Sequence, residues 1–172
     1  EKFVILHVGA FNDQKNHKYL IDIFNMYHGE NPQSQLWLIG EGTTKEYIKD
    51  LTRKYDIEDA VNFIGKTNDV ASYMMAADCF VLPSLYESFG IVNIEAQATG
   101  LPCVVSDSVP NAAKVSEFFY KVSLDDKQKW VEAIGSCQKL AIQREGSYLN
   151  LFDYGFDVSQ TSSELLEYYK GL

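Results

Sequence analysis

Short apolar runs alternate along the chain with longer segments in which apolar residues recur at helical spacing. The short runs, rich in β-branched and aromatic residues and typical of buried strands, occupy 3–8, 35–39, 60–64, 79–82, 102–106 and 118–122. The segments with helical spacing occupy 15–28, 43–55, 69–76, 91–99, 111–117, 126–144 and 157–170. Strands that alternate with helices indicate βαβ units, which place the strands side by side in a parallel sheet.

The predicted strands are apolar almost throughout, rather than at every second position. Strands covered by helices on both faces have this pattern, because neither face meets water. The sequence therefore predicts one α/β domain over 1–172, a doubly wound, Rossmann-like parallel sheet of about six strands. Ligands bind such sheets beyond the carboxyl ends of the strands, so we expect a site in the loops that follow them.

Composition limits the classes of function. The chain of 172 residues is 46% hydrophobic, which suits one sizeable core, and its net charge of −9 comes without a cluster of Lys and Arg. Nucleic acid is therefore not expected as a partner. No run approaches the roughly 18 to 20 apolar residues that span a bilayer. The start, EKFVILHV, has neither Met nor signal-peptide flanks and is expected to be a cut inside a longer chain.

Three cysteines, Cys79, Cys103 and Cys137, lack the spacing of metal ligands. Their odd number and the apolar runs around the first two predict buried thiols in a reducing compartment. The three histidines accompany no nucleophile motif. We expect His7 to be a strand residue, and His17 and His28 to lie on helix surfaces.

The segment 82–106 has the strongest functional pattern. A strand ends at Pro83, a polar loop holds Glu87, and a helix begins near Gly90. A helix start leaves its first N–H groups unpaired and carries partial positive charge, so the amides of about 89–92 form a predicted anion site. A glycine at position 90 lets a ligand approach the backbone closely.

Glu95 lies in the first turns of this helix. At helical spacing it falls roughly opposite Asn93 and Gln97, so it is not expected on the polar face. One interpretation is a surface carboxylate that offsets the helix dipole. The other is a carboxylate that binds the two adjacent hydroxyls of a ribose, while the phosphates lie over the free amides one turn earlier.

Two more side chains are candidates for a ligand with a diphosphate and a sugar. Glu87 would orient a sugar hydroxyl or stabilise positive charge at the anomeric carbon; the alternative is a solvated loop acid. Lys15 follows Gly9 in a strand, loop and helix segment, with Asn12 or Asp13 expected to cap the helix. A cation at a helix start is reasonable where it meets a diphosphate; otherwise Lys15 is an ordinary surface lysine.

Two segments carry weaker signals. Gly40 and Gly42 bracket a turn into a helix, but no GxGxxG opens the first helix, so an NAD enzyme is disfavoured. After the strand at 60–64, backbone near Ile64 would reach a base edge and Lys66 would approach a phosphate or base; the alternative is a plain strand end and turn.

Together these segments resemble the C-terminal, donor-binding domain of glycosyltransferase family 4, retaining enzymes of the two-domain GT-B architecture. The resemblance covers essentially the whole chain and is closest to bacterial surface-polysaccharide enzymes. It rests on four motifs in the family's order, VGAFNDQKNHKYLIDIF, LIGEG, VNFIG and PSLYESFGIVNIEAQATGLPCVVSD. In the last motif, Glu87 and Glu95 match the family's E-x7-E pair.

The resemblance implies transfer of a glycosyl group from a nucleotide diphosphate sugar, with a UDP-sugar favoured, to an acceptor hydroxyl, with retention and with no metal or other cofactor. It implies that Lys15 binds the diphosphate, that Glu95 binds the ribose, and that Glu87 is the catalytic residue beside the transferred sugar. The other donor-binding positions that it implies are Gly9, Ile64, Lys66, Ser88, Phe89, Gly90, Ile91 and Val92.

The resemblance also implies partners beyond this chain. The acceptor site belongs to an N-terminal domain that the chain lacks, so the isolated domain is expected to be inactive. That domain and the nucleotide sugar are the expected partners, in a cytoplasmic protein that the missing domain would hold at the inner face of the membrane. Ala10 departs from the family, which usually has Arg at this position.

Two alternatives stay open. The first is a catalytically inactive nucleotide-sugar-binding or partner subunit of the same fold, which the residue at position 10 permits. The second is an unrelated doubly wound domain, like a response regulator or an epimerase, in which both glutamates are incidental.

Overall fold

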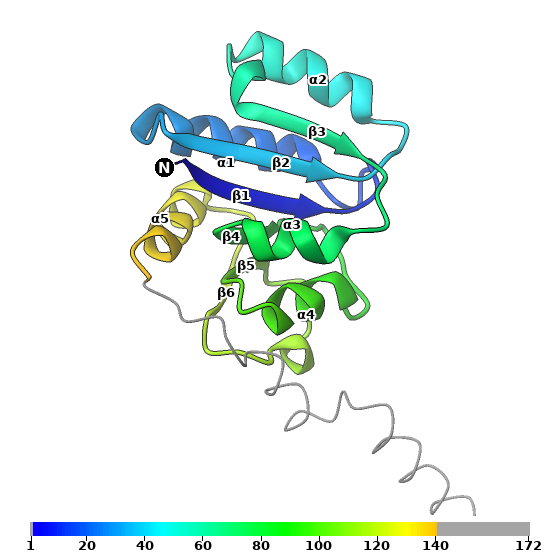
Figure 1. Cartoon of the computed structure of the whole chain (residues 1–172), viewed down its shortest axis with the longest axis vertical. Helices are drawn as coiled ribbons and strands as arrows, with labels where there is room; N and C mark the ends of the chain where they lie inside the picture. The colour runs from blue at the N-terminus through cyan, green and yellow to red at the C-terminus, as the bar shows by residue number, and fades with distance from the viewer. Residues whose placement is uncertain (1, 141–172) are drawn as a thin grey trace, which may run out of the picture.

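The computed structural model describes residues 2–140 of the chain (Figure 1). Its strands are β1 (Phe3–Val8), β2 (Ser34–Ile39), β3 (Val61–Gly65), β4 (Cys79–Leu82), β5 (Cys103–Ser106) and β6 (Phe119–Val122). Its α-helices are α1 (His17–Glu30), α2 (Lys45–Lys54), α3 (Val70–Ala76), α4 (Ile91–Ala98) and α5 (Lys127–Gln138). Short 3-10 helices, Glu58–Ala60 and Asn111–Ala113, precede β3 and β6.

The strands form one parallel sheet in the order β3-β2-β1-β4-β5-β6. The chain therefore winds outward from β1 to β3 and then returns to place β4 against the other side of β1. This reversal of strand order lies between β1 and β4, which is where doubly wound sheets bind their ligands. The predicted six-stranded, doubly wound fold is confirmed.

Helices cover both faces of the sheet (Figure 1). Under α1, α2 and α5, Ile5 of β1 belongs to a buried cluster with Phe24 and Trp130. Its neighbour Leu6 points the other way, into a cluster with Met74 under α3 and α4. Burying an apolar side chain of this size contributes about 2 kcal/mol, so two continuous apolar layers hold the sheet rigid. That rigid sheet fixes the positions of the loops at its carboxyl edge.

The prediction of a helix at 111–117 is wrong. Only Asn111–Ala113 forms a single 3-10 turn. The buried Gln97 side chain binds the backbone that a helix would have used: its Nε2 donates to the Ala113 carbonyl at 2.8 Å and its Oε1 accepts from the Val115 N–H at 2.8 Å. The tertiary contact therefore replaces the local hydrogen bonds of a helix.

The other predicted helices within the described residues are present with shifted ends. The helix expected at 126–144 is observed as α5, and the rest of that range beyond residue 140 lies outside the described residues. The helix expected at 157–170 also lies outside them.

The cysteines are free and buried, as the sequence predicts. Burial raises the pKa of the Cys79 and Cys103 thiols well above their ordinary value, so both stay protonated near neutral pH. Among the helices of residues 2–140, none has the length and apolar character needed to cross a bilayer.

Candidate functional site

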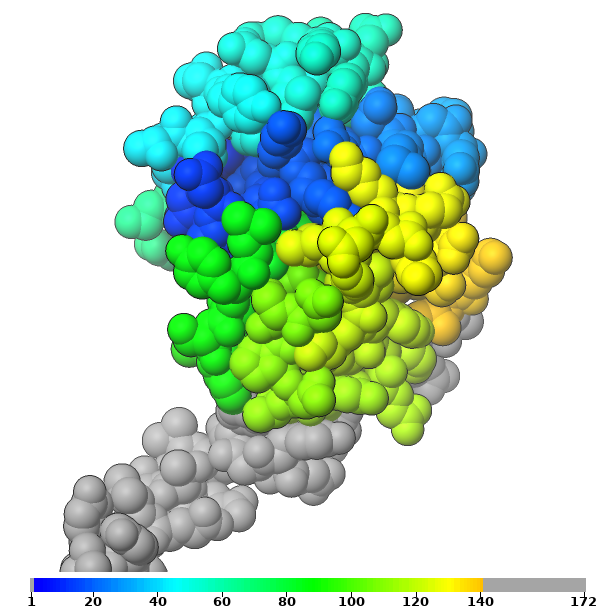
Figure 2. Space-filling view, turned by 180° about the vertical axis from the view of Figure 1, so that it is seen from behind, coloured from blue at the N-terminus to red at the C-terminus, as the bar shows by residue number. Residues whose placement is uncertain are grey.

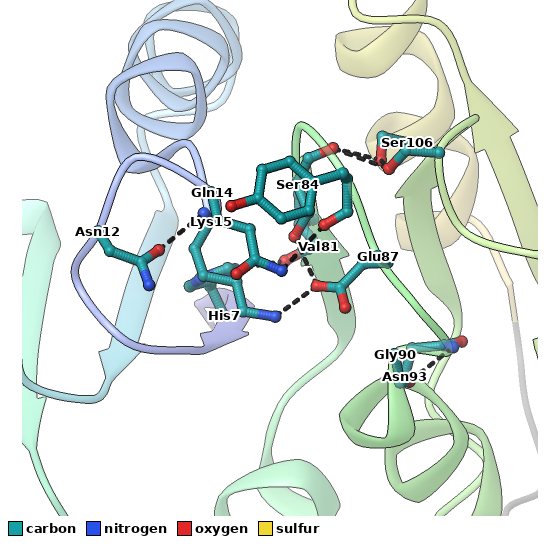
Figure 3. Close-up of polar contacts among 12 residues, drawn as sticks. His7, Asn12, Gln14, Lys15, Val81, Ser84, Glu87, Gly90, Asn93 and Ser106 are labelled. Atoms are coloured by element: carbon teal, nitrogen blue, oxygen red, sulfur yellow. Dashed lines mark hydrogen bonds and ion pairs between the residues drawn. The ribbon is translucent and has the colours of Figure 1, made fainter.

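Two loops at the carboxyl edge of the sheet, the β1–α1 loop and the β4–α4 loop, bring the strongest candidates together (Figure 3). The Leu85 N–H donates to the Gln14 carbonyl at 2.8 Å, and Gln14 Nε2 donates to the Tyr86 carbonyl at 3.0 Å. Two hydrogen bonds therefore join the β1–α1 loop to the β4–α4 loop. Residues that are far apart in the sequence become neighbours at the switch point of the sheet.

Lys15 and Glu87 point toward one another from these loops (Figure 3). Lys15 Nζ donates to Glu87 Oε1, and both side chains are largely buried. The same carboxylate oxygen accepts from Ser84 Oγ at 2.9 Å. A carboxylate held by two donors has a fixed orientation, so Glu87 is not a solvated loop acid.

Ser84 was not singled out from the sequence, although it anchors the loop that holds Glu87. It is fully buried, and its carbonyl accepts from Ser106 Oγ at 2.7 Å and from Ser108 Oγ at 3.0 Å. The end of β5 thereby fixes the backbone three residues before Glu87. The available signal was a pair of serines at the end of an apolar strand, Ser106 as its last residue and Ser108 two positions later.

The start of α1 differs from the prediction. The helix begins at His17, after Asn16 in a left-handed conformation, and no side chain caps it. Asn12 Oδ1 instead accepts from the Lys15 N–H at 3.1 Å, which closes a turn before the helix. Lys15 thus lies on the loop rather than in the helix, and its side chain reaches across the strand end to the β4–α4 loop.

Gly9 leaves room for this arrangement. A Cβ at position 9 would lie 3.0 Å from His7 Nε2 and 3.1 Å from Lys15 Cγ, so a larger residue would displace the lysine. His7 is fully buried in β1, as expected of a strand residue, and its Nδ1 lies 2.8 Å from the Val81 carbonyl. Burial lowers the pKa of His7 to about 4, so the ring is neutral at pH 7 and Nδ1 donates this bond.

The prediction that His17 lies on a helix surface is wrong. The side chain is only 2% exposed. Its ring stacks on Phe11 with ring centroids 4.1 Å apart, and it meets the His7 ring edge-on with ring centroids 4.6 Å apart. Burial, followed by the charges of His7 and Lys15, lowers the pKa of His17 to about 2. The first residue of α1 faces inward because the preceding loop folds Phe11 under it.

The glycines at 40 and 42 serve the packing of these loops. A Cβ on Gly40 would lie 2.0 Å from the Gly9 carbonyl oxygen, and one on Gly42 would lie 2.3 Å from the Phe11 carbonyl oxygen. The Gly40 N–H also donates to the Gly65 carbonyl at 3.0 Å. The loops after β1, β2 and β3 therefore touch through bare backbone. Beyond them, Ile64 is partly buried at the end of β3, and Lys66 is exposed in the turn.

Helix α4 begins at Ile91, preceded by Gly90 at a φ of 71°. That angle lies in the left-handed region that favours glycine. No side chain caps this helix start, so its first N–H groups remain available to an anion. Around it, Ser88 is exposed, and Phe89 and Val92 are partly buried.

The expected orientation of α4 is reversed. Asn93 and Gln97, which the sequence suggested as its polar face, are buried and bonded to each other, with Gln97 Nε2 2.6 Å from Asn93 Oδ1. Asn93 Nδ2 also donates to the Gly90 carbonyl at 3.0 Å, which fixes the helix start. Glu95 lies exposed instead, one turn after the exposed Ile91. The helix thus presents its lone carboxylate outward.

Within residues 2–140, no three or more His, Cys, Asp or Glu side chains gather in a way that could hold a metal ion. The chemistry of this edge is that of one buried ion pair, an uncapped helix start and an exposed carboxylate on the same helix. Cationic and N–H donors suit phosphate oxygens, whereas carboxylates suit hydroxyl groups.

Comparisons with known proteins agree with this chemistry. The family described as Glycosyl transferases group 1 matches residues 1–142. EpsF of Bacillus subtilis, whose name describes it as a glycosyltransferase, is 31% identical over 98% of this chain and 45% of its own. An Escherichia coli UDP-Gal:alpha-D-GlcNAc-diphosphoundecaprenol alpha-1,3-galactosyltransferase is 32% identical over 77% of this chain and 35% of its own.

Solved structures share the fold. HepE of Anabaena in complex with UDP superposes with a TM-score of 0.82 at 23% identity, over 99% of this chain and 49% of that one. A Staphylococcus aureus TarM variant with bound UDP superposes with a TM-score of 0.86 at 17% identity, over 96% of this chain and 35% of that one. The chain spans about half or less of the length of the relatives it matches.

Proposed function

The chain belongs to the family of glycosyl transferases group 1, and from that premise we propose that it is the donor-binding half of a retaining GT-B glycosyltransferase. The enzyme would move a sugar from a nucleotide diphosphate sugar to an acceptor hydroxyl in bacterial polysaccharide synthesis. Transfer breaks the bond between the anomeric carbon and the nucleotide diphosphate, and forms a bond from the same carbon to the acceptor oxygen on the same face.

The observation that carries this proposal is the meeting of Lys15 and Glu87 between β1 and β4, near the uncapped start of α4. A donor sugar offers a diphosphate followed by a pyranose ring with hydroxyls. A lysine and a carboxylate side by side supply a cation for the diphosphate and an acceptor for the adjoining sugar. In this arrangement Lys15 binds the diphosphate, and Glu87 faces the transferred sugar.

The α4 helix supplies the rest of the donor site in this proposal. The N–H groups from Gly90 to Val92 bind phosphate or sugar oxygens, and Glu95 accepts from both ribose hydroxyls. Gly90 precedes the helix in a left-handed conformation that residues with a Cβ rarely adopt, so the glycine fixes the shape of this helix start. As the leaving diphosphate gains charge, Lys15 and the helix start stabilise it, so no metal is required for that step.

We favour UDP as the nucleotide. The E. coli relative uses UDP-Gal by its name, and HepE binds UDP and UDP-glucose. The base would lie near Ile64, where backbone groups at the end of β3 reach its edge. Nucleotide sugars of this kind are cytoplasmic substrates, and buried free thiols suit a protein of that reducing compartment.

A second function, a nucleotide-sugar-binding subunit without transferase activity, is favoured by one observation. Position 10 is an exposed alanine, so the first loop offers one cation, Lys15, where the family usually has two. Lys66 is exposed just after β3, and in an active enzyme it would be the compensating cation. The Lys66→Ala variant tests this contact: UDP binding weakens if Lys66 contacts the diphosphate and is unchanged otherwise. Sugar transfer by the full-length protein separates the two functions, because both bind the nucleotide sugar and only the enzyme transfers the sugar.

Calorimetric titration with UDP, GDP and ADP tests the donor site. We expect UDP to bind and Glu95→Gln to weaken it about tenfold, because a ribose would lose hydrogen bonds to a charged acceptor. Glu132→Gln, at an exposed position of α5, is the matched control and should leave the affinity unchanged. Absence of binding at millimolar UDP, or equal affinity for the Glu95 variant, would overturn the assignment.

A further inference from the structure

A second hollow lies at the same edge of the sheet, beside the donor site rather than within it. It has a volume of about 200 Å³ and lies between the loop before α1, the start of α2 and Leu85 of the β4–α4 loop. Lys15, Glu87 and Glu95 are not among its lining residues. In Figure 2 the dark-blue loop before α1 lies between the cyan α2 segment and the green loop after β4.

Several polar side chains line this hollow without partners. His17 is 2% exposed, yet neither ring nitrogen has a hydrogen-bond partner among the described residues. Thr44 Oγ1 is buried without a partner in the same way. Buried polar groups of native proteins are almost always paired, so two such groups beside one hollow make it the place to look for a further ligand.

The hollow is also lined by a carboxylate, an ammonium group and an amide. Asp13 and Lys18 both line it, and neither joins an ion pair within residues 2–140. Asn16 lines it as well, and its side chain does not cap α1. A carboxylate accepts, an ammonium donates and an amide does both, which is the set of groups that binds hydroxyls.

Two exposed apolar side chains complete the lining. Tyr47 is 52% exposed and Leu85 is 50% exposed, although large apolar side chains are normally buried. An aromatic ring beside mixed donors and acceptors suits a pyranose, which has an apolar C–H face and a rim of hydroxyls. The volume is about ten times the space that one water needs, so a single ion would leave the hollow largely unfilled.

We propose that this hollow binds a saccharide unit of the acceptor, an inference that rests on the proposed transferase function. Tyr47 and Leu85 contact the apolar face of the sugar, Asp13 accepts from its hydroxyls, and Lys18 and Asn16 donate to them. Leu85 lies two residues before Glu87 and is bonded through its N–H to Gln14, next to Lys15. A sugar in the hollow is therefore adjacent to the donor site, and this half of the enzyme contributes to acceptor choice.

An anion is a weaker occupant, although the hollow lies at two helix starts. The Asp13 carboxylate would repel a phosphate in the same space. Replacing that carboxylate separates the two occupants, because Asp13→Asn removes a charged acceptor from a sugar but removes a repulsion from an anion. The variant should weaken saccharide binding about tenfold and strengthen phosphate binding.

The test is a titration of the 15N-labelled chain of 172 residues, followed by amide NMR. Probes are glucose and N-acetylglucosamine up to about 100 mM, since single sugars bind weakly, with inorganic phosphate and UDP in separate titrations. We expect the sugars to shift amides of residues 44–48, which lie at the hollow and not at the donor site, and UDP to shift those of Lys15 and of residues 89–95. UDP binding without sugar binding would overturn this inference alone; failure of UDP would overturn the donor site instead.

Two tyrosine variants give the matched comparison. Tyr47→Ala removes the aromatic ring from the hollow, whereas Tyr86→Ala removes one that is 63% exposed and does not line it. Sugar affinity should fall about fivefold in the first and stay unchanged in the second. Equal effects of the two variants, or shifts at 44–48 caused by phosphate and not by sugars, would overturn the proposal.

Discussion

Lys15 and Glu87 are 72 positions apart in the sequence and form a largely buried ion pair at the switch point of the sheet. The two residues that the family resemblance assigns to the diphosphate and to the sugar are thus bonded to each other. A diphosphate that binds Lys15 must either displace Glu87 or share the lysine with it. In the proposed donor site, Glu87 would therefore influence the affinity for the nucleotide as well as the position of the sugar.

Glu87→Gln should tighten the binding of UDP. The neutral amide holds Lys15 less strongly than a carboxylate does, so the lysine becomes available to the diphosphate. A hydrogen bond to a charged group contributes about 1.5 kcal/mol, which corresponds to about a tenfold change in the dissociation constant measured by calorimetry. Lys15→Met, in contrast, should abolish measurable binding of UDP.

The control for this prediction is Glu117→Gln, which removes one negative charge from an exposed loop position. If both glutamine variants bind UDP with the same affinity, any increase in affinity comes from the loss of one negative charge and not from the release of Lys15. Weaker binding by Glu87→Gln would show that the carboxylate supports the nucleotide site rather than competing with it.

Gln97→Ala should destabilise the domain more than an ordinary surface change. The substitution leaves the Ala113 carbonyl and the Val115 N–H buried without their side-chain partner. Loss of two such bonds is expected to lower the free energy of unfolding by about 2 to 4 kcal/mol. Urea denaturation measures this value, with Gln128→Ala on the exposed face of α5 as the control. Similar midpoints for both variants would contradict it.

The central strands β1, β4 and β5 were predictable because each is an apolar run, and burial on both faces leaves no competing pattern. The meeting of the loops after β1 and β4 was predictable too, since parallel strands end at one edge. The candidate pair Lys15 and Glu87 is brought together for that reason. Contacts that depend on tertiary partners left no such local signal.

Gln97 and His17 show why the remainder was not predictable. Helical spacing gives the angle between side chains but not which side meets the core, and a buried amide with four partners resembles a surface amide in the sequence. His17 is buried only because Phe11 folds beneath it. The outward direction of Glu95 follows from the buried amides and became evident only with them.

Stability should fall in mild acid because of the buried histidines. Burial lowers the pKa of His7 to about 4 and that of His17 to about 2, against about 6.5 in an unfolded chain. The unfolded chain therefore binds more protons below pH 6.5, and its free energy falls relative to the native state. Between pH 7 and pH 5 each histidine should lower the free energy of unfolding by about 2 kcal/mol.

His17→Phe isolates one of these contributions. Phenylalanine keeps a ring against Phe11 but does not titrate, so the variant should lose about 2 kcal/mol less than the natural chain between pH 7 and pH 5. Urea denaturation at several pH values supplies the comparison. The same pH dependence in both proteins would contradict the prediction, because it would mean that His17 binds a proton equally well in the native and in the unfolded chain.

The substitution of glycine by alanine should have opposite effects on stability at positions 40 and 29. A Cβ on Gly40 would lie 2.0 Å from the Gly9 carbonyl oxygen, at a φ of 144°, whereas one on Gly29 in α1 meets nothing within 4 Å. Gly40→Ala must displace the backbone that leads to Lys15, so it should destabilise the domain by about 3 kcal/mol and weaken UDP binding. Gly29→Ala should stabilise it by about 0.5 kcal/mol, because alanine favours a helix. Urea denaturation and UDP titration of both variants test the contact between the loops after β1 and β2. Equal stability of the two variants would show that these loops can separate without loss of stability.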